Sequence, residues 1–180
     1  MEDNHHGLVL VHTGEGKGKT TAAIGLAIRA WGEGLRVLIL QFIKGGWKYG
    51  ELKAIEALRQ AEPHIEVRQC GLGFTQREKS DLEKHIKAAQ EALKEAEDEI
   101  TSGNWDLVIL DEINYAVKFG LLTEQEILNL LGKKPAELHL VMTGRDARPE
   151  IIEQADLVTE MKLIRHHYQK GIKAQKGIEF

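Results

Sequence analysis

Short apolar runs alternate with longer amphipathic segments along the chain. The runs predict strands at residues 8–11, 36–43, 65–69, 107–110, 138–143 and 157–161. The run LVIL at 107–110 has no alternation of apolar and polar positions, which is typical of a strand buried on both faces. Each run is short enough for a strand and too short for a membrane span.

The segments between these runs have a helical period. Residues 80–100 show it most clearly, because Leu82, Ile86, Ala89, Leu93, Ala96 and Ile100 form one apolar stripe, and Ser80 with Glu83 gives a capping-box pattern at the start. Further helices are predicted at residues 20–31 and 51–59, at 127–131 after a second capping box of Thr123 and Glu126, and at Pro149.

This alternation predicts an α/β fold with a mostly parallel sheet and helices on both faces. A chain of 180 residues suits one domain, residues 1–180, with a core of useful size. The basic tail at 165–180 has no clear period, and the sequence does not place it.

A glycine-rich loop follows the first predicted strand and precedes the first predicted helix. It reads TGEGKGKTT and consists of Thr13, Gly14, Glu15, Gly16, Lys17, Gly18, Lys19, Thr20 and Thr21. The end of this segment fits the phosphate-loop pattern G-x-x-x-x-G-K-[ST], although Thr13 replaces the first glycine. Loop N–H groups, Lys19 and the helix N-terminus would bind phosphate, and the Thr20 hydroxyl would contact Mg²⁺. The fold is therefore predicted to be P-loop NTPase-like (RecA-like).

The buried strand at 107–110 leads directly into Asp111 and Glu112. Two acids can simply cap a strand end, but beside a phosphate loop one carboxylate is expected to hold Mg²⁺ directly or through water. The predicted ligand is a magnesium nucleotide, most simply ATP. Nucleotide binding alone does not define the reaction.

Composition and charge limit the possible binding partners and cellular location of the protein. The formal net charge of -4 argues against broad nucleic-acid binding, and no apolar run approaches a membrane span. Cys70 is the only cysteine, so no internal disulfide can form, and burial as a small apolar residue is its simplest role. The acidic start MEDNHH lacks the basic region of a signal peptide. These features predict a cytoplasmic protein.

Several longer motifs resemble the CobA-type ATP:corrinoid adenosyltransferases. In chain order they are TGEGKGKTTAAIGLAIRAWGEG, QFIKGGWKYGE, GFT, LDEINY, MTGRDARPEIIEQADLVTEM and KAQKGIEF. The resemblance covers nearly the whole chain. The phosphate loop occurs in many families, whereas QFIKG and the tail are far more specific.

The resemblance implies a reaction in which a corrinoid, such as cobalamin or a precursor, is the second substrate. Its reduced Co(I) attacks the 5′ carbon of the ATP ribose, and inorganic triphosphate leaves. The phosphate in the loop would then belong to the leaving group. Because cobalt is the nucleophile, the protein needs no general base and must instead position the substrates and stabilise the leaving charge.

The resemblance also implies roles for particular residues. Lys19 and Glu112 match catalytic positions, and Thr20 and Glu112, with Asp111 nearby, match the magnesium site. In hydrolysing NTPases an acid such as Glu112 can instead orient water, and the sequence does not separate these roles. Phe74 matches an aromatic residue that lies beside the corrinoid and helps to displace its lower ligand.

The chain departs from the family pattern at two positions. Better-known members carry GFTW, whereas Gln76 replaces the tryptophan here, so ligand displacement is expected to be less complete or to use another side chain. Glu15 stands where many members have asparagine. A carboxylate near triphosphate is unfavourable, so Glu15 is expected to face solvent or the ribose.

Other candidates carry weaker signals. Lys44 and Trp47 lie in a segment that matches the surroundings of the family's active site, although Trp47 could equally be a packing residue. Arg145 follows a strand end, where ligands bind in open α/β sheets, and it could contact a ligand or form a surface ion pair. The pairs His5–His6 and His166–His167 are not expected to bind metal, because neighbouring side chains point in different directions.

Three functions remain to be separated. The leading one is adenosyl transfer, the second is a P-loop ATPase or small-molecule kinase, and the third is a nucleotide-dependent module that carries corrinoid without changing it. The second explains the phosphate loop and the strand-end acids but not QFIKG or the tail. The resemblance further implies a homodimer and an electron-donor protein such as a flavodoxin.

Overall fold

The computed structural model describes residues 6–46, 49–73 and 79–179. Its centre is a six-stranded sheet in the order β3-β2-β4-β5-β1-β6, and all the neighbouring strands are parallel. The strands are β1 (Val9–Thr13), β2 (Val37–Gln41), β3 (Ile65–Gln69), β4 (Leu107–Asp111), β5 (His139–Thr143) and β6 (Leu157–Glu160). The predicted α/β, P-loop NTPase-like fold is confirmed.

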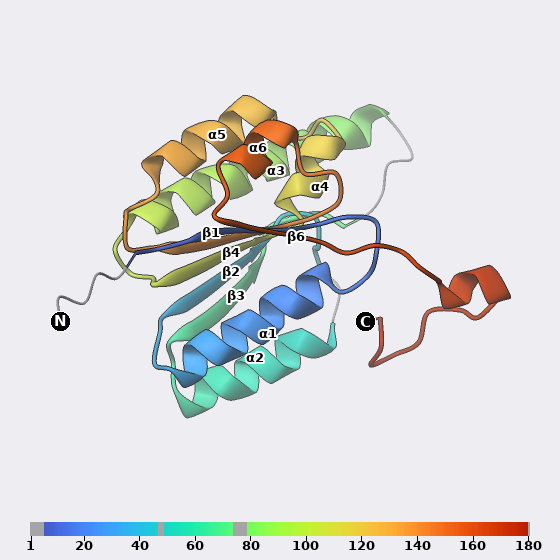
Figure 1. The fold of residues 1–180 in the computed structure, drawn as a ribbon, viewed down its shortest axis with the longest axis horizontal. Helices are drawn as coiled ribbons and strands as arrows, with labels where there is room; N and C mark the ends of the chain where they lie inside the picture. Colours follow the sequence, from blue (N-terminus) through green and yellow to red (C-terminus); the bar gives the residue numbers. More distant parts are fainter. Residues whose placement is uncertain (1–5, 47–48, 74–78, 180) are drawn as a thin grey trace.

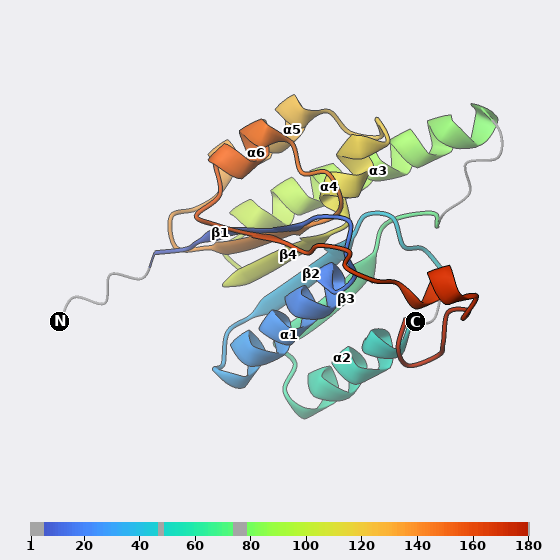
Figure 2. The same cartoon turned by 45° about the vertical axis from the view of Figure 1, so that its right-hand side comes forward.

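Helices cover both faces of the sheet (Figure 1). One face carries α1 (Lys19–Gly32) and α2 (Gly50–Ala61). The other carries α3 (Lys79–Thr101), α4 (Ile113–Lys118), α5 (Glu124–Lys133) and α6 (Pro149–Glu153). A turned view shows the chain after β6 passing toward α1 and α2 and ending near them (Figure 2).

Two buried clusters hold the layers together, one on each side of the sheet. Helix α1 packs through Ala23, Ala27 and Ala30, whose spacing places small side chains on one stripe of the helix. Their small size lets α1 lie close to the sheet. The phosphate loop at the start of α1 is therefore anchored by a packed helix on one side and by β1 on the other.

The ends of β1, β4 and β5 meet at one edge of the sheet. Strand β5 lies between β1 and β4. In a parallel sheet the carboxyl ends of all strands share an edge, so the loops after these three strands are brought together there. This edge carries the phosphate loop, the strand-end acids and the loop that begins at Gly144.

Some of the predicted local features are present in the structure, and two of its helices were not predicted. The Thr123–Glu126 capping box is present at the start of α5, and Pro149 lies in the first turn of α6. The side chain of Ser80, the first residue of the other predicted capping box, lies outside the described part of the structure. Helix α4 and the short 3₁₀ helix η1 (His167–Lys170) were not predicted.

Within residues 6–46, 49–73 and 79–179, no helix is both long enough and apolar enough to cross a membrane.

Candidate active site

The phosphate loop connects β1 to α1 through a sharp turn. Gly14 and Gly18 have φ angles of 95° and 111°, in the region that favours glycine. A Cβ on Gly14 would lie 2.5 Å from the Met161 carbonyl oxygen, and the Gly16 N–H donates to that same oxygen at 2.6 Å. The loop is thus shaped by its glycines and held against the chain that follows β6.

Lys19 is buried within this loop. Its Nζ donates to the carbonyl oxygens of Gly14 and Gly16 at 2.7 and 2.6 Å. Burial lowers the pKa of Lys19, and the nearby Glu112 carboxylate opposes that shift. The ammonium group is fixed by backbone carbonyls at the place where the pattern expects a phosphate-binding cation.

Asp111 is the buried centre of a hydrogen-bond network at the end of β4. Its Oδ1 accepts from the Thr20 hydroxyl at 2.7 Å and from the Thr143 hydroxyl at 2.8 Å. Its Oδ2 accepts from Gln41 Nε2 at 3.2 Å. The Thr20–Asp111 bond joins the start of α1 to the end of β4, so the two halves of the predicted nucleotide site are in direct contact.

Glu112 follows immediately in a strained conformation. Its φ angle is 64°, which non-glycine residues rarely adopt, and its N–H donates to the Thr143 hydroxyl at 2.9 Å. Burial raises the pKa of Glu112, and the charge of Asp111 acts in the same direction. The turn sends the side chains of Asp111 and Glu112 to different places within one site.

The oxygens of Thr20, Asp111 and Glu112 form a donor set that suits a hard cation such as Mg²⁺. The direct hydrogen bond between Thr20 and Asp111 supports this fit, because it places a hydroxyl and a carboxylate together beside the phosphate loop. These residues could hold the ion against the phosphates of a nucleotide.

Lys44 reaches Asp111 from the loop after β2. Its Nζ lies 3.3 Å from Asp111 Oδ2 and 3.3 Å from Glu51 Oε1. The same Nζ is 4.8 Å from the centroid of the Tyr49 ring. Burial acts to lower the pKa of Lys44, but the charges of Asp111 and Glu51 outweigh it and raise the pKa.

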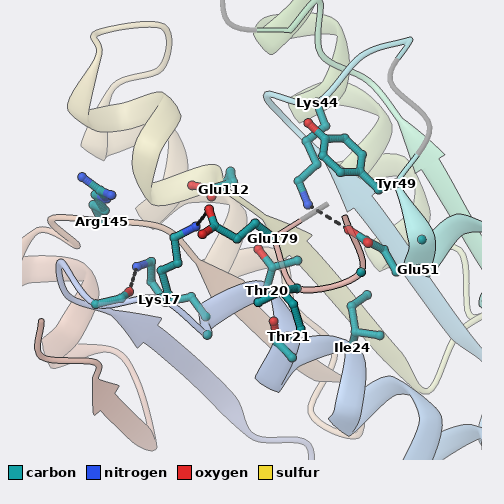
Figure 3. A pocket seen from close by; sticks show the side chains of 16 residues that line it. Lys17, Thr20, Thr21, Ile24, Lys44, Tyr49, Glu51, Glu112, Arg145 and Glu179 are labelled. Atoms are coloured by element: carbon teal, nitrogen blue, oxygen red, sulfur yellow. Dashed lines mark hydrogen bonds and ion pairs between the residues drawn. The ribbon is translucent and has the colours of Figure 1, made fainter. Parts of the chain in front are cut away.

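A pocket of about 500 Å³ opens over these groups (Figure 3). Its walls come from the phosphate loop, the start of α2, the turn after β4 and the C-terminal tail. The lining residues are Gly16, Lys17, Gly18, Lys19, Thr20, Thr21, Ile24, Lys44, Tyr49, Gly50, Glu51, Glu112, Arg145, Gly177, Ile178 and Glu179.

Arg145 and Glu15 meet at the rim of this pocket. Arg145 Nη1 donates to Glu15 Oε2 at 2.9 Å, and Lys118 Nζ lies 3.8 Å from the other Glu15 oxygen. Glu15 is exposed, which agrees with the expectation that it faces away from phosphate. Arg145 forms an ion pair, one of its two predicted roles, and it also lines the pocket. Its contact with a ligand stays a prediction.

Thr13 does not line the pocket, and three other residues singled out from the sequence lie outside the part of the chain that the structure describes. Thr13 turns its hydroxyl to the Ala147 N–H at 3.1 Å, where it supports the loop after β5. Trp47, Phe74 and Gln76 lie outside the described residues.

Cys70, Trp31 and Trp105 pack against the hydrophobic core of the protein. Burial raises the pKa of the Cys70 thiol to about 12, and the Glu95 carboxylate adds to the shift. A thiol with such a pKa is a poor nucleophile at neutral pH. Trp31 and Trp105 pack against the two core clusters, as predicted.

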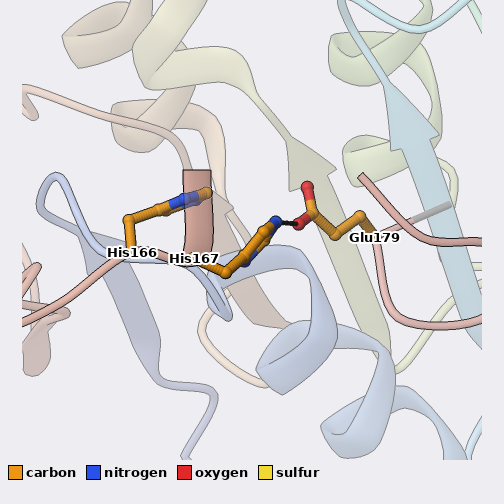
Figure 4. A group of neighbouring side chains, drawn as sticks. All are labelled: His166, His167 and Glu179. Atoms are coloured by element: carbon orange, nitrogen blue, oxygen red, sulfur yellow. Dashed lines mark ion pairs between the residues drawn. The ribbon is translucent and has the colours of Figure 1, made fainter. Parts of the chain in front are cut away.

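The prediction that the side chains of His166 and His167 point in different directions is wrong. The His166 and His167 rings stack with centroids 4.5 Å apart, so these neighbours point to the same side. The reason is that His166 is extended and caps η1, which turns the chain between the two residues. Together with Glu179 they form the cluster in Figure 4, whose ligand-type atoms lie within 4.8 Å of one another.

Sequence reasoning missed the polar partners of the site, which are Gln41, Glu51, Thr143 and Glu179. Gln41 and Thr143 are the last residues of β2 and β5, and that position was the available signal. Glu51 and Glu179 belong to the two specific motifs QFIKGGWKYGE and KAQKGIEF. A buried lysine in a glycine loop, joined through threonine to a strand-end aspartate, defines the class of nucleotide-binding α/β proteins with a phosphate loop.

Comparisons with known proteins identify the family within this class. A family model described as ATP:corrinoid adenosyltransferase BtuR/CobO/CobP matches residues 5–180. The chain is 43% identical over 178 residues to a corrinoid adenosyltransferase of Pseudomonas aeruginosa, covering 98% of this chain and 85% of that protein. It is 36% identical to a corrinoid adenosyltransferase of Escherichia coli, covering 98% and 87%. The chain belongs to the ATP:corrinoid adenosyltransferase family.

A solved structure shows the same fold at low sequence similarity. The flagellar accessory protein FlaH from Methanocaldococcus jannaschii superposes with a TM-score of 0.56 and 14% identity, covering 86% of this chain and 71% of that chain.

Proposed function

We propose that this protein transfers the 5′-deoxyadenosyl group of ATP to the Co(I) centre of a reduced corrinoid and releases inorganic triphosphate. The observation that carries the proposal is the family match across residues 5–180, which includes the phosphate loop, the strand-end acids and the tail. Cobalt supplies both electrons of the new Co–C bond. The C5′–O bond breaks, and its electron pair leaves with triphosphate.

The protein's chemical task in this reaction is to stabilise a leaving polyanion. Lys19, the loop N–H groups and the N-terminus of α1 are the proposed groups for this task, and the hydrogen bonds of Lys19 within the loop support the proposal by fixing its ammonium group there. Lys17 adds a cation at the rim of the same pocket. Fixed groups of this kind need no reorganisation when charge develops.

Thr20, Asp111 and Glu112 are the proposed magnesium-binding residues. Mg²⁺ would neutralise triphosphate oxygens there, and Lys44 would hold the Asp111 side chain in place through their ion pair. Lys19, Phe74 and Glu112 are the proposed catalytic residues. Trp47 and Arg145 are proposed to border the substrates.

Further proposals follow the family resemblance. Residues 1–180 act as one P-loop adenosyltransferase domain in the cytoplasm and form a homodimer. Phe74 faces the corrinoid ring and helps to displace the lower ligand of cobalt. The electron that produces Co(I) comes from a protein donor such as a flavodoxin.

Anaerobic incubation with MgATP and chemically reduced cobalamin tests the proposed activity. The expected result is the absorbance spectrum of an adenosylcobalt product that reverts on exposure to light. Omitting ATP gives the matched control. An unchanged corrinoid spectrum under conditions in which ATP is consumed would contradict the proposal and favour an ATPase or a kinase.

A further inference from the structure

The end of the C-terminal tail forms part of the pocket wall. Gly177, Ile178 and Glu179 line the pocket together with the phosphate loop (Figure 3). Glu179 Oε2 accepts a hydrogen bond from Lys17 Nζ, which makes a charge-assisted ion pair across 162 positions of the chain. The tail is therefore attached electrostatically to the loop that receives phosphate.

The other Glu179 oxygen is poorly satisfied. His167 Nε2 lies 2.5 Å from Oε1, but Oε1 is buried and makes no aligned hydrogen bond. Only 11% of the Glu179 side chain is exposed. The ion pair with Lys17 lowers the pKa of Glu179, so the carboxylate is charged at neutral pH. A buried oxygen without an aligned donor lowers the cost of moving the carboxylate elsewhere.

The cluster of His166, His167 and Glu179 does not have the properties of a metal site. His166 Nδ1 accepts from the Tyr168 N–H at 3.1 Å, so the other nitrogen of a neutral ring carries the proton. Lys17, Lys162 and Arg165 line the adjoining cleft and would repel a cation. The surroundings favour an anion, and Glu179 is the anion that the chain itself supplies.

We propose that Glu179 is a further residue of the nucleotide site, which occupies Lys17 in the nucleotide-free protein and is displaced from it by the triphosphate of ATP. This inference rests on the proposed function in one respect, since it takes triphosphate to be the ligand of the loop. The exchange makes the tail respond to nucleotide, because the carboxylate and the phosphates compete for one ammonium group.

The competition has a direct physical basis. A triphosphate in the loop would be attracted by Lys17 and repelled by a carboxylate that remained in the same pocket. Moving Glu179 away removes the repulsion and frees Lys17. The effect is moderate, since half of the Lys17 side chain is exposed and solvent screens the pair.

The test uses Glu179→Gln with isothermal titration calorimetry of inorganic triphosphate, ATP and adenosine. Glutamine keeps the size of the side chain and removes its charge. We expect triphosphate and ATP to bind about fivefold more tightly to the variant and adenosine to bind with unchanged affinity. Glu179→Asp, which keeps the charge, is the matched control and should bind triphosphate within about twofold of the natural protein.

A double-mutant cycle with Lys17→Gln separates competition from a general effect on the tail. If Glu179 acts mainly through Lys17, the Glu179→Gln change should have a much smaller effect on triphosphate binding in the Lys17→Gln background than in the natural protein. Unchanged or weaker triphosphate binding by Glu179→Gln would overturn the inference. Failure of the natural protein to bind triphosphate or ATP at all would instead contradict the proposed function.

Discussion

The hydrogen bond between Thr20 and Asp111 connects the phosphate loop to the strand-end acids. Thr20→Val removes the hydroxyl and keeps the shape of the side chain, so we expect the adenosylation rate at saturating ATP to fall about 10- to 100-fold, the usual cost of disturbing a metal site. The rate should become more dependent on Mg²⁺ concentration. Thr20→Ser keeps the hydroxyl and should stay close to the natural rate, and equal rates for Val and Ser would exclude the proposed role.

The charged side chain of Glu112 is proposed to serve the site and at the same time to destabilise the folded protein. Its pKa is raised by burial and by Asp111, so its stabilising contribution is present below the ordinary carboxyl pKa and is lost as the pH rises through the raised value. At neutral pH the charged side chain therefore destabilises the folded state. Glu112→Gln should raise Tm there by about 2–4 °C, the shift that 1 kcal/mol gives in a chain of this size, and should abolish most activity.

Thermal unfolding followed by circular dichroism at two pH values checks this prediction. The Tm difference between Glu112→Gln and the natural protein should shrink as the pH falls from neutral toward the ordinary glutamate pKa of about 4.3. Because the pKa of Glu112 is raised, its side chain takes up a proton in the folded state before that pH is reached. A difference that stays constant between neutral and acidic pH would show that the charge of Glu112 is not its cause.

At the scale of elements, the loops after β2 and β3 are locked together by close backbone contact. A Cβ on Gly71 would lie 2.3 Å from the Ile43 carbonyl carbon, and a Cβ on Gly45 would lie 1.8 Å from the Gly71 oxygen. Gly71→Ala should displace the loop that carries Lys44 and lower the free energy of unfolding by about 1–3 kcal/mol. Chemical denaturation measures that loss.

A matched glycine in α1 provides the control. A Cβ on Gly25 meets nothing within 4 Å, so Gly25→Ala should leave stability unchanged or increase it by up to about 1 kcal/mol through helix propensity. Equal effects of the two substitutions would contradict the importance of the contact between the loops.

Helix α5 depends on a local cap far from the proposed chemistry. The Thr123 hydroxyl accepts from the Glu126 N–H, and the Glu126 carboxylate accepts from the Thr123 N–H at 2.7 Å. Thr123→Ala should lower stability by about 1 kcal/mol and leave the adenosylation rate unchanged, whereas Thr123→Ser should preserve both. A loss of activity at the assay temperature without unfolding would show that α5 contributes to the site.

The elements themselves were predictable where the signal is local. Apolar runs and helical stripes are set by neighbouring residues, and the glycine loop has a pattern with a known mechanism, so β1, α1 and β4 were predicted together with Lys19, Thr20 and Asp111. Helix α4 was not predicted because it begins at Ile113, immediately after β4 and Glu112, and the left-handed conformation of Glu112 replaces the usual connecting loop.

Partners that come from distant parts of the chain could not be read in the same way. Gln41 lies 70 positions from Asp111, and its burial beside that carboxylate depends on the pairing of β2 with β4. The contact of Glu179 with Lys17 depends on the path of the tail, which has no period to reveal it. Local sequence thus predicts which residues sit at strand ends, and the sheet order determines which of them meet.

At the scale of the whole molecule, one parallel sheet directs the loops after β1, β2, β4 and β5 toward one pocket, which the tail also lines. The central claim is that the triphosphate held there is the leaving group and is not itself transferred or hydrolysed. Phosphorus NMR of the products after one anaerobic reaction with MgATP and reduced cobalamin tests this claim most directly. We predict intact inorganic triphosphate in amounts equal to the adenosylcobalt product, whereas ADP with orthophosphate, or ADP with a phosphorylated acceptor, would contradict the role of triphosphate as the leaving group.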